Sequence, residues 1–500
     1  MDLGAGGRCE DGGRFTRDVL LRRSLLLGGG LLVPGAVNRL LAGDVALAAA
    51  PPKIPPGAVH HFLSRPDLRP PVLSILHASA VSDGYLFLAP SAGPGQRGVL
   101  ILDGRGQVVY FLPTTPNSAM NFRVARYHGK PVLTWWEGKS QSGLGRGTHV
   151  ILDESYRQVA RVPAGDGRQS DLHEFVITPH DTALVTSYEV RPADLSSVGG
   201  PATGKVIGGV VQELALPSGR VLFEWRSLDH VPIEETHAAF MGHPLDYFHI
   251  NSIDLLADGN LLVSARNTWA VYKVSRASGR VIWRLGGRKS DFAMGRGTVF
   301  AWQHDARHHG HDIVSIFDDG AGPQVQPQSR VLVIELDAAH KRATLVRAYT
   351  HHPNRLLSQF MGNAQVLPNG NVVVGWGNEP YVTEFAPDGA ILFDAKLPRG
   401  GQNYRAFRFG WAGDPSGRPV LVAPGGRHRG TAFVSWNGAT EVVAWRLRAG
   451  TAAGNLQTFG TTARRGFETG LALPRGMRFA EAAAVDRHGH ELGRSATVRV

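Results

Sequence analysis

A unit of about 40 residues that repeats along the chain constrains the fold more than any other feature of the sequence. Its clearest copy runs from Asp246 to Gly287 and contains the alternating strand patterns LLVSAR, AVYKVS and VIWRL. Asp258-Gly259-Asn260 and Ala277-Ser278-Gly279 supply tight turns between strands. Four short strands joined by tight turns in this length are typical of one β-propeller blade. A single blade leaves both faces of its sheet uncovered, so further copies are expected.

Similar units recur on both sides of this copy. PNGNVVV at residues 368–374 matches ADGNLLV at residues 257–263 almost residue for residue. The units open on a segment that carries His173, His249, His304 or Gln365. This period predicts an all-β protein with a six-bladed β-propeller over residues 81–415. A parallel β-helix is the main structural alternative, but its coils are shorter than these units.

The sequence changes character beyond residue 400. Short strand patterns such as AFVSWNG, EVVAWRL and FETGLALP have the spacing of a small immunoglobulin-like or fibronectin-like β-sandwich. We therefore predict a C-terminal sandwich over residues 416–500, and a linker and lead-in over residues 51–80. The predicted sandwich contains no residue cluster typical of catalysis.

Residues 1–50 have the features of an export signal. Arg22-Arg23 precede the apolar run Leu25–Val33, and Ala46-Leu47-Ala48 offers a small-residue cleavage site. This pattern predicts a twin-arginine signal and a secreted, periplasmic or cell-envelope location. The run is too short for a stable membrane span, and the alternative is a short N-terminal helix of a cytoplasmic protein. Cys9 is the only cysteine, so the mature protein is expected to have neither a disulfide nor thiol catalysis.

The charge of the chain limits the classes of molecule that it is expected to bind. The formal net charge is +11 at pH 7, and the excess lies in arginines dispersed along the sequence. No block of Lys and Arg with interleaved aromatic residues occurs, which argues against nucleic-acid binding. A positive field instead attracts small anionic substrates toward a cleft. The sequence does not indicate an oligomeric state.

Three histidines occupy equivalent positions in the repeat. Because the innermost strand of each blade lines the central channel, His173, His249 and His304 are expected to converge on one axis. Imidazoles there can serve as nucleophile and as proton carrier near neutral pH. The nearest candidates to hold a tetrahedral anion through forked donors are Arg266, Arg307 and Arg330.

Each of these residues also has a purely structural interpretation. The histidines can be hydrogen-bonded residues at strand starts, and the arginines can pair with carboxylates. Asp171 and Glu174 either orient His173 or are paired elsewhere, and Gln303 and Asp305 pose the same choice beside His304.

Two segments superficially suggest metal sites. His308-His309-Gly310-His311 lies in a predicted turn without cysteine support, and Asp318-Asp319-Gly320 lacks the ligand spacing of a calcium loop. We predict no metal and no cofactor. Neither a GxSxG motif nor a P-loop nor a Rossmann fingerprint occurs in a credible strand-turn-helix setting.

Several segments, in order, resemble the arylsulfotransferase family, in particular its arylsulfotransferase-like branch. They are DLHEFVITP, DYFHINSID with DGNLLVSARNTWAVYKV and SGRVIWRLGG, QHDAR with SIFDDG, GNAQVLPNGNVVVGWG, and VSWNGATEV. The resemblance implies a six-bladed propeller that needs no nucleotide sulfate donor. It also implies transfer of a sulfo group from a small phenolic sulfate ester to a phenol, through a sulfated histidine.

By position, the resemblance assigns catalytic roles to His249 and His304, with His173 as a third candidate. The predicted substrate-binding residues are Arg330, Arg266, Asn251 and Gln365. In the family's enteric branch the nucleophile lies in a later blade, where this chain has Gly362-Asn363-Ala364-Gln365 and no histidine. One of the three histidines therefore takes that role, or the chemistry differs.

Aromatic residues add a second open choice. Tyr247, Phe248, Trp302 and Trp376 either line a phenol pocket or belong to the blade cores.

Two other functions fit the same residues. The chain can be an exported propeller that binds a ligand or partner without sulfotransferase activity, which the missing late histidine favours. It can also be a propeller hydrolase or a quinoprotein-like dehydrogenase, since SGRVIWRL is similar to the tryptophan-bearing repeats of quinoproteins.

Overall fold

The computed structural model describes residues 57–242 and 244–500. The predicted export signal and Cys9 lie outside the described residues. The described chain consists of strands and short 3-10 turns without an α-helix, which confirms the all-β prediction. Within it, no helix is long and apolar enough to cross a membrane.

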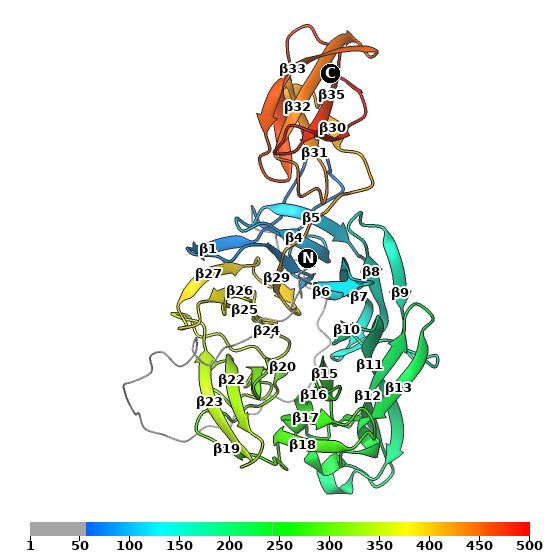
Figure 1. The fold of residues 1–500 in the computed structure, drawn as a ribbon, viewed down its shortest axis with the longest axis vertical. Coiled ribbons are helices and arrows are strands. Elements are labelled where there is room, and N and C mark those ends of the chain that lie inside the picture. The colour runs from blue at the N-terminus through cyan, green and yellow to red at the C-terminus, as the bar shows by residue number, and fades with distance from the viewer. Residues whose placement is uncertain (1–56, 243) are drawn as a thin grey trace, which may run out of the picture.

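Most strands form antiparallel sheets that follow one another around a ring, with further sheets attached to one side (Figure 1). The first sheet contains β29 (Phe407–Phe409), β2 (Tyr85–Leu88), β4 (Gly98–Leu102) and β5 (Val108–Pro113). The second contains β6 (Ser118–Tyr127), β7 (Lys130–Gln141), β8 (Leu144–Leu152) and β9 (Gln158–Val162). The third contains β10 (Phe175–Ile177), β11 (Thr182–Ala193), β12 (Gly204–Ala215) and β13 (Arg220–Arg226), with β14 (Leu245–Asp246) beside β12.

The ring continues in the same way. The next sheet contains β15 (Ile250–Leu255), β16 (Leu261–Ala265), β17 (Ala270–Val274) and β18 (Val281–Gly286). After it come β20 (His304–His308), β21 (Ile313–Asp318), β22 (Arg330–Asp337) and β23 (Arg342–Tyr349), with β19 (Ala293–Met294) beside β23. The last sheet contains β24 (Asn363–Val366), β25 (Val372–Gly375), β26 (Tyr381–Phe385) and β27 (Ile391–Lys396).

Strands from both ends of the ring segment close it. β1 (Ser74–Ala78) pairs with β27, and β29 pairs with β2, so each end completes a sheet begun by the other. A short ladder between β3 (Pro90–Ala92) and β28 (Gln402–Asn403) reinforces this closure. The sequence patterns did not reveal β29, and β1 falls in the segment we predicted as lead-in.

The cores lie between neighbouring sheets. Because successive side chains of a strand point to opposite faces, each sheet contributes to two cores. Leu86 and Leu88 of β2 pack toward β25–β27, whereas Phe87 between them packs toward β6–β8. Leu262 of β16 packs toward β21 and β22, whereas Val263 packs toward β11 and β12. Burial on both faces explains why the inner strands read as nearly continuous apolar runs.

The C-terminal residues form two further sheets. One contains β30 (Val420–Val422), β31 (Thr431–Ser435) and β34 (Glu468–Ala472). The other contains β33 (Asn455–Ala463), β32 (Ala444–Ala452), β35 (Phe479–Val485), β36 (Glu491–Arg494) and β37 (Val498–Arg499). They share an apolar cluster that includes Val434 and Trp445. Asn437 connects them to the ring, since its amide exchanges two 2.9 Å hydrogen bonds with the backbone of Phe111.

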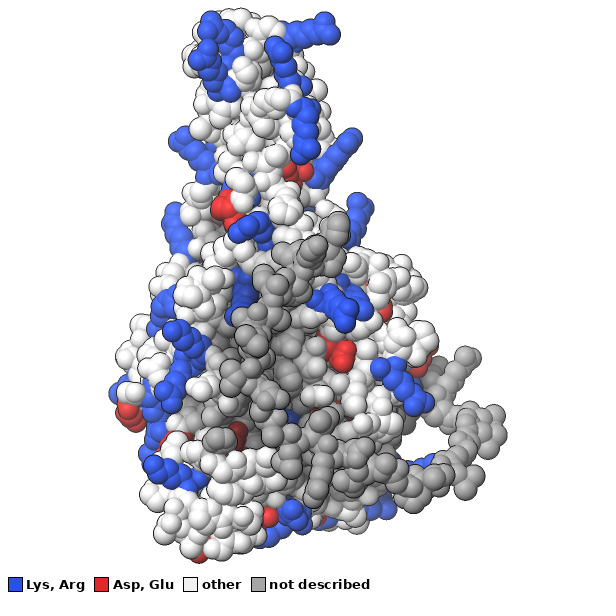
Figure 2. Space-filling view, turned by 180° about the vertical axis from the view of Figure 1, so that it is seen from behind, with Lys and Arg blue, Asp and Glu red and all other residues white. Residues whose placement is uncertain are grey.

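The surface reflects the positive net charge. On the face shown in Figure 2, lysine and arginine side chains spread over the C-terminal sheets and the ring, and acidic side chains are sparse. A positive surface of this kind raises the local concentration of anions.

Candidate active site

His173, His249 and His304 meet at one cavity of about 770 Å³, where the inner strands β10, β15 and β20 begin. The ring centroids of His173 and His249 are 4.8 Å apart, and those of His173 and His304 are 6.5 Å apart. These three residues, which we call the histidine layer, are thus gathered as the repeat predicted.

A carboxylate holds each imidazole through Nδ1. Asp246 Oδ2 lies 2.5 Å from Nδ1 of His249, and Asp319 Oδ2 lies 2.7 Å from Nδ1 of His304. Asp171 Oδ2 makes the same contact with His173. An ionised carboxylate only accepts hydrogen bonds, so pairing with one places the imidazole proton on Nδ1 and leaves the lone pair on Nε2. Burial alone would raise the pKa of Asp171, but its contacts with His173 lower it, whereas burial raises the pKa of Asp319 well above its usual range against the opposing charge of Arg266.

The local electrostatics keep His304 neutral. Burial lowers its pKa well below the usual range, and the positive charge of Arg266 and the two neighbouring imidazoles lower it further. Burial also lowers the pKa of His173, although Asp171 opposes this shift. Within the described part of the chain, Nε2 of His304 accepts one hydrogen bond, a long one of 3.4 Å from the backbone N–H of Met361. A neutral imidazole with a weakly engaged Nε2 is a competent nucleophile.

Arg266 supplies a fixed positive charge beside the histidines. It lines the cavity, and its Nη1 and Nη2 donate 3.0 Å hydrogen bonds to Asn267 Oδ1 and to the carbonyl oxygen of Gln359. Its guanidinium lies 4.8 Å from the ring centre of Trp302. Of the three arginines that we predicted as anion-binding candidates, it is the one that lines this cavity.

The backbone at the site is unusual. His249 has φ of +58°, a conformation that few non-glycine residues adopt, and β15 has an irregular register between Ile250 and Ser252. The tip of the β7–β8 hairpin packs against this ring, since a Cβ atom on Gly143 would lie 3.2 Å from Cε1 of His249. Strained backbone of this kind is common where a side chain must be aimed at a functional site.

The rest of the cavity wall is mixed. Met120, Leu172, Phe360 and Met361 contribute apolar surface, and Arg97 and Lys139 contribute positive charge. The aromatic residues we considered for a phenol pocket do not line it: Tyr247, Phe248 and Trp376 belong to the cores between sheets. Among residues 57–242 and 244–500, no group of three or more His, Cys, Asp or Glu residues is placed to hold a metal ion.

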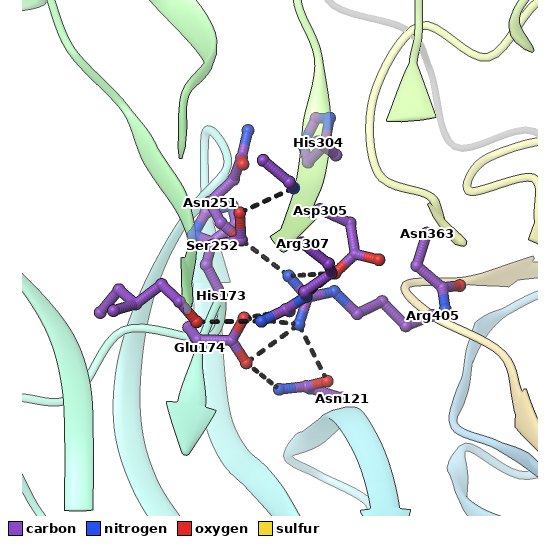
Figure 3. Close-up of polar contacts among 12 residues, drawn as sticks. Asn121, His173, Glu174, Asn251, Ser252, His304, Asp305, Arg307, Asn363 and Arg405 are labelled. Carbon is purple, nitrogen blue, oxygen red and sulfur yellow. Dashed lines mark hydrogen bonds and ion pairs between the residues drawn. The ribbon is translucent and has the colours of Figure 1, made fainter. Parts of the chain in front are cut away.

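A second set of charged residues lies beside the histidine layer: Glu174 follows His173, Asp305 and Arg307 follow His304 on β20, and Arg405 comes from the segment before β29 (Figure 3). Glu174, Asp305, Arg307 and Arg405 form this arginine layer. Nη1 of Arg405 lies 3.1 Å from both carboxylate oxygens of Glu174, and Arg307 pairs with Glu174 and Asp305. Burial alone would raise the pKa of Glu174, but Arg307, Arg405 and nearby Arg123 outweigh it and lower the pKa to about 2. Glu174 therefore serves this network and does not orient His173.

The remaining predicted binding residues lie outside the cavity wall. Arg330 pairs with Asp318 at 2.9 Å and donates to the carbonyl oxygen of Val299. Asn251 is fully buried and donates a 2.6 Å hydrogen bond to the carbonyl oxygen of Gln303. Arg307, as described above, belongs to the arginine layer.

The late repeat unit uses amides to join strands. Gln365 exchanges hydrogen bonds of 3.0 and 2.7 Å with the backbone of Arg408, and Asn363 exchanges bonds of 2.9 and 2.8 Å with Ala406. Gln365 lines a second cavity, of about 1020 Å³, which includes Arg307 and so lies toward the opposite end of β20. Where we looked for a late histidine, the chain therefore has residues that tie β24 to β29.

Sequence reasoning missed three residues at these layers. Asp246 and Asp319 each hold an imidazole. In the sequence we interpreted Asp246 as part of a strand start and Asp319 as part of a turn. Arg405 precedes β29, a strand that is too short to show the apolar–polar alternation by which strands are recognised in a sequence. The one available signal was Asp246 itself, three residues before His249 in a repeat unit that opens on polar residues.

The family of the chain follows from sequence comparison. A model of the arylsulfotransferase (ASST) family matches residues 123–397, more than half of the chain. The chain belongs to the arylsulfotransferase family. The matched region contains all three histidines and Arg266, and it ends before the C-terminal sheets. No curated protein sequence gives a significant match.

Solved structures that align with this arylsulfotransferase family member share little sequence with it. A protein of unknown function from Bacteroides caccae is 13% identical, with a TM-score of 0.42, covering 65% of this chain and 98% of that one. A catalytically inactive virginiamycin B lyase from Staphylococcus aureus is 6% identical, with a TM-score of 0.36, covering 73% and 97%. Hydrazine synthase from Kuenenia stuttgartiensis is 12% identical, with a TM-score of 0.31, covering 73% and 90%.

Proposed function

We propose that this protein transfers a sulfo group from a phenolic sulfate ester to a phenol through a sulfated histidine. The observation that carries the proposal is the convergence of three imidazoles, each held at Nδ1 by a carboxylate, beside Arg266 in one cavity. We infer that the ring is a six-bladed propeller and that the C-terminal sheets form a sandwich packed on its outside.

His304 is the nucleophile in this proposal. It is neutral near pH 7, its Nδ1 proton is held by Asp319, and after burial the charge of Arg266 has the largest effect in lowering its pKa. Nε2 attacks the sulfur atom, so an N–S bond forms as the bond from sulfur to the phenolic oxygen breaks. Arg266 stabilises the negative charge of the sulfuryl oxygens as they pass through the transition state.

A second histidine carries the proton. The His249 side chain is 10% exposed, against 4% for His173 and 2% for His304, so it has the readiest access to the leaving group. It donates a proton to the departing phenolate, and Asp246 stabilises the imidazolium before that transfer. The acceptor phenol then gives its proton to His249 and attacks sulfur, which breaks the N–S bond and restores His304.

The test is a transfer assay with para-nitrophenyl sulfate as donor, with and without phenol. We expect nitrophenol release that depends on the acceptor, and a sulfo group on the peptide that contains His304 when the acceptor is left out. His304→Ala should lower the rate by roughly 10³-fold or more, because the covalent route is lost. His128→Ala is the matched control, since His128 forms an exposed pair with Asp181 away from the cavity.

Other outcomes separate the remaining functions. Release of nitrophenol without an acceptor identifies a sulfatase. No release from a panel of aryl sulfates, with folded protein, contradicts the proposal and favours a binding module.

A further inference from the structure

The cavity holds more positive charge than a single sulfuryl group requires. Besides Arg266, its wall includes Arg97, immediately before β4, and Lys139, near the end of β7. Among the residues that the structure describes, Asp246 is the only acidic one in the wall, and its carboxylate contacts His249. Two cations of the wall are therefore left without a negative charge inside the cavity.

Neither of these side chains is neutralised elsewhere. Among residues 57–242 and 244–500, the side chains of Arg97 and Lys139 make no hydrogen bond, ion pair or ring contact; Arg97 takes part only through its carbonyl oxygen, which accepts from Thr114. Arg307 and Arg405 in the adjacent layer, by contrast, both pair with Glu174. Both side chains are exposed, so they lie at the open rim of the cavity, where cations without partners attract an anionic ligand.

The cations of the wall come from different parts of the chain. Arg266 lies with the histidines, whereas Lys139 lies on the β7–β8 hairpin, whose tip at Gly143 reaches His249. Met120, Leu172, Phe360 and Met361 provide the apolar surface that an aromatic ring needs. The volume of about 770 Å³ suits a ligand larger than a simple phenyl sulfate, because drug-sized ligands occupy cavities of about 300–1,000 Å³.

We propose that the phenolic substrate carries a second acidic group, such as a carboxylate, that Arg97 and Lys139 bind while the phenolic oxygen faces the histidine layer. This inference rests on the proposed function for the phenol, and it adds the class of substituent. Arg97 and Lys139 come from different strand segments, and together they would hold the carboxylate away from the reacting phenolic oxygen. They would therefore also fix which end of the substrate's aromatic ring enters the cavity first.

Binding measured by calorimetry tests this without turnover. The ligands are para-hydroxyphenylacetate and para-cresol, which match in the phenol and differ in the carboxylate. We expect the wild-type protein to bind the acid at least about 10-fold more tightly, and this ratio to fall as salt rises from low to high ionic strength because ions screen the pairing.

Variants then locate the effect. Arg97→Ala and Lys139→Ala should each lower the ratio by about 3-fold to 10-fold, and the double variant should bring it close to one. Lys130→Ala, at the other end of the same strand β7, is the matched control and should leave the ratio unchanged. Circular dichroism shows whether each variant is folded, and Arg97→Gln and Lys139→Gln replace any variant that is not.

The outcomes distinguish this inference from the proposed function. Equal binding of the two ligands, or a ratio that survives the double variant, overturns the inference even if sulfo transfer occurs. A carboxylate preference that depends on Arg97 and Lys139 supports it even if the transfer assay with para-nitrophenyl sulfate fails, and that failure then counts against the proposed reaction alone.

Discussion

The histidine layer and the arginine layer are adjacent, since Glu174 follows His173 and Asp305 follows His304, and they use charge in opposite ways. In the histidine layer each ring has its own carboxylate, so pairing consumes Nδ1 and leaves Nε2 toward the cavity. In the arginine layer two carboxylates, Glu174 and Asp305, are both shared by Arg307 and Arg405, so these charges neutralise one another. One-to-one pairing thus orients a reactive group, whereas shared pairing holds buried charges together.

The largest effect is expected from removing the charge of Glu174, which should lower the stability of the protein. Glu174→Gln removes one of the two carboxylates that Arg307 and Arg405 share and leaves Asp305 to balance both buried cations, so we expect a loss of about 3–5 kcal/mol in the free energy of unfolding. Chemical denaturation at pH 7 measures it. Glu491→Gln, which removes a surface ion pair with Arg494, is the control and should cost less than about 1 kcal/mol.

The pH dependence of the wild-type protein follows from the same group. The pKa of Glu174 falls from 4.5 to about 2 on folding, so its stabilising effect is present above pH 4.5 and is lost as the pH falls toward 2. Glu174→Gln should flatten this part of the stability profile. A variant as acid-sensitive as the wild type would show that other carboxylates control acid unfolding.

Substitutions in the histidine layer should lower the rate of sulfo transfer more than they lower the free energy of unfolding. Asp319→Asn keeps a group of the same size beside His304, but its amide can donate to Nδ1 and so move the imidazole proton to Nε2. We expect sulfo transfer to fall by roughly 10²-fold to 10⁴-fold. Unfolding should change much less than in Glu174→Gln, because Oδ2 has one partner, His304, and Oδ1 has none among the described residues. Equal losses of stability in both variants would remove the distinction between the layers.

A smaller effect should appear in the pH–rate profile. The wild-type kcat/KM should hold its value below pH 6.5 before it falls, because burial and Arg266 keep the pKa of His304 low. Arg266→Gln removes one of these causes, so the acidic limb should move up by less than about one pH unit, in addition to a slower rate. Arg330→Gln, which alters an arginine outside the cavity wall, is the control. A limb that stays in place in Arg266→Gln would mean that a different group titrates.

The smallest effect is expected at the edge of the arginine layer. Nη1 of Arg123 lies 4.0 Å from Oε1 of Glu174, and the Arg123 side chain is 26% exposed. Because burial lowers the pKa of Arg123, its positive charge contributes little to the stability of the fold. Arg123→Gln should change the free energy of unfolding by less than about 1 kcal/mol. A loss as large as that of Glu174→Gln would show that the layer acts as one unit to its edge.

The sequence by itself determined the class of fold and which histidines meet. Alternation and turn residues are local signals, so the repeat predicted the strands around His173, His249 and His304 and their common position. Similarity of motifs such as DYFHINSID also indicated the family that the comparison then showed.

Only the tertiary structure decided the partners of those residues. Asp319 reaches His304 from the segment after β21, Arg405 reaches Glu174 from the segment before β29, and β29 completes the sheet that contains β2, more than 300 residues earlier in the chain. These pairings depend on strand register, on backbone irregularities such as that beside His249, and on how the ring closes. No local period encodes such features, because a hydrogen bond between distant segments is set by the geometry of every sheet between them.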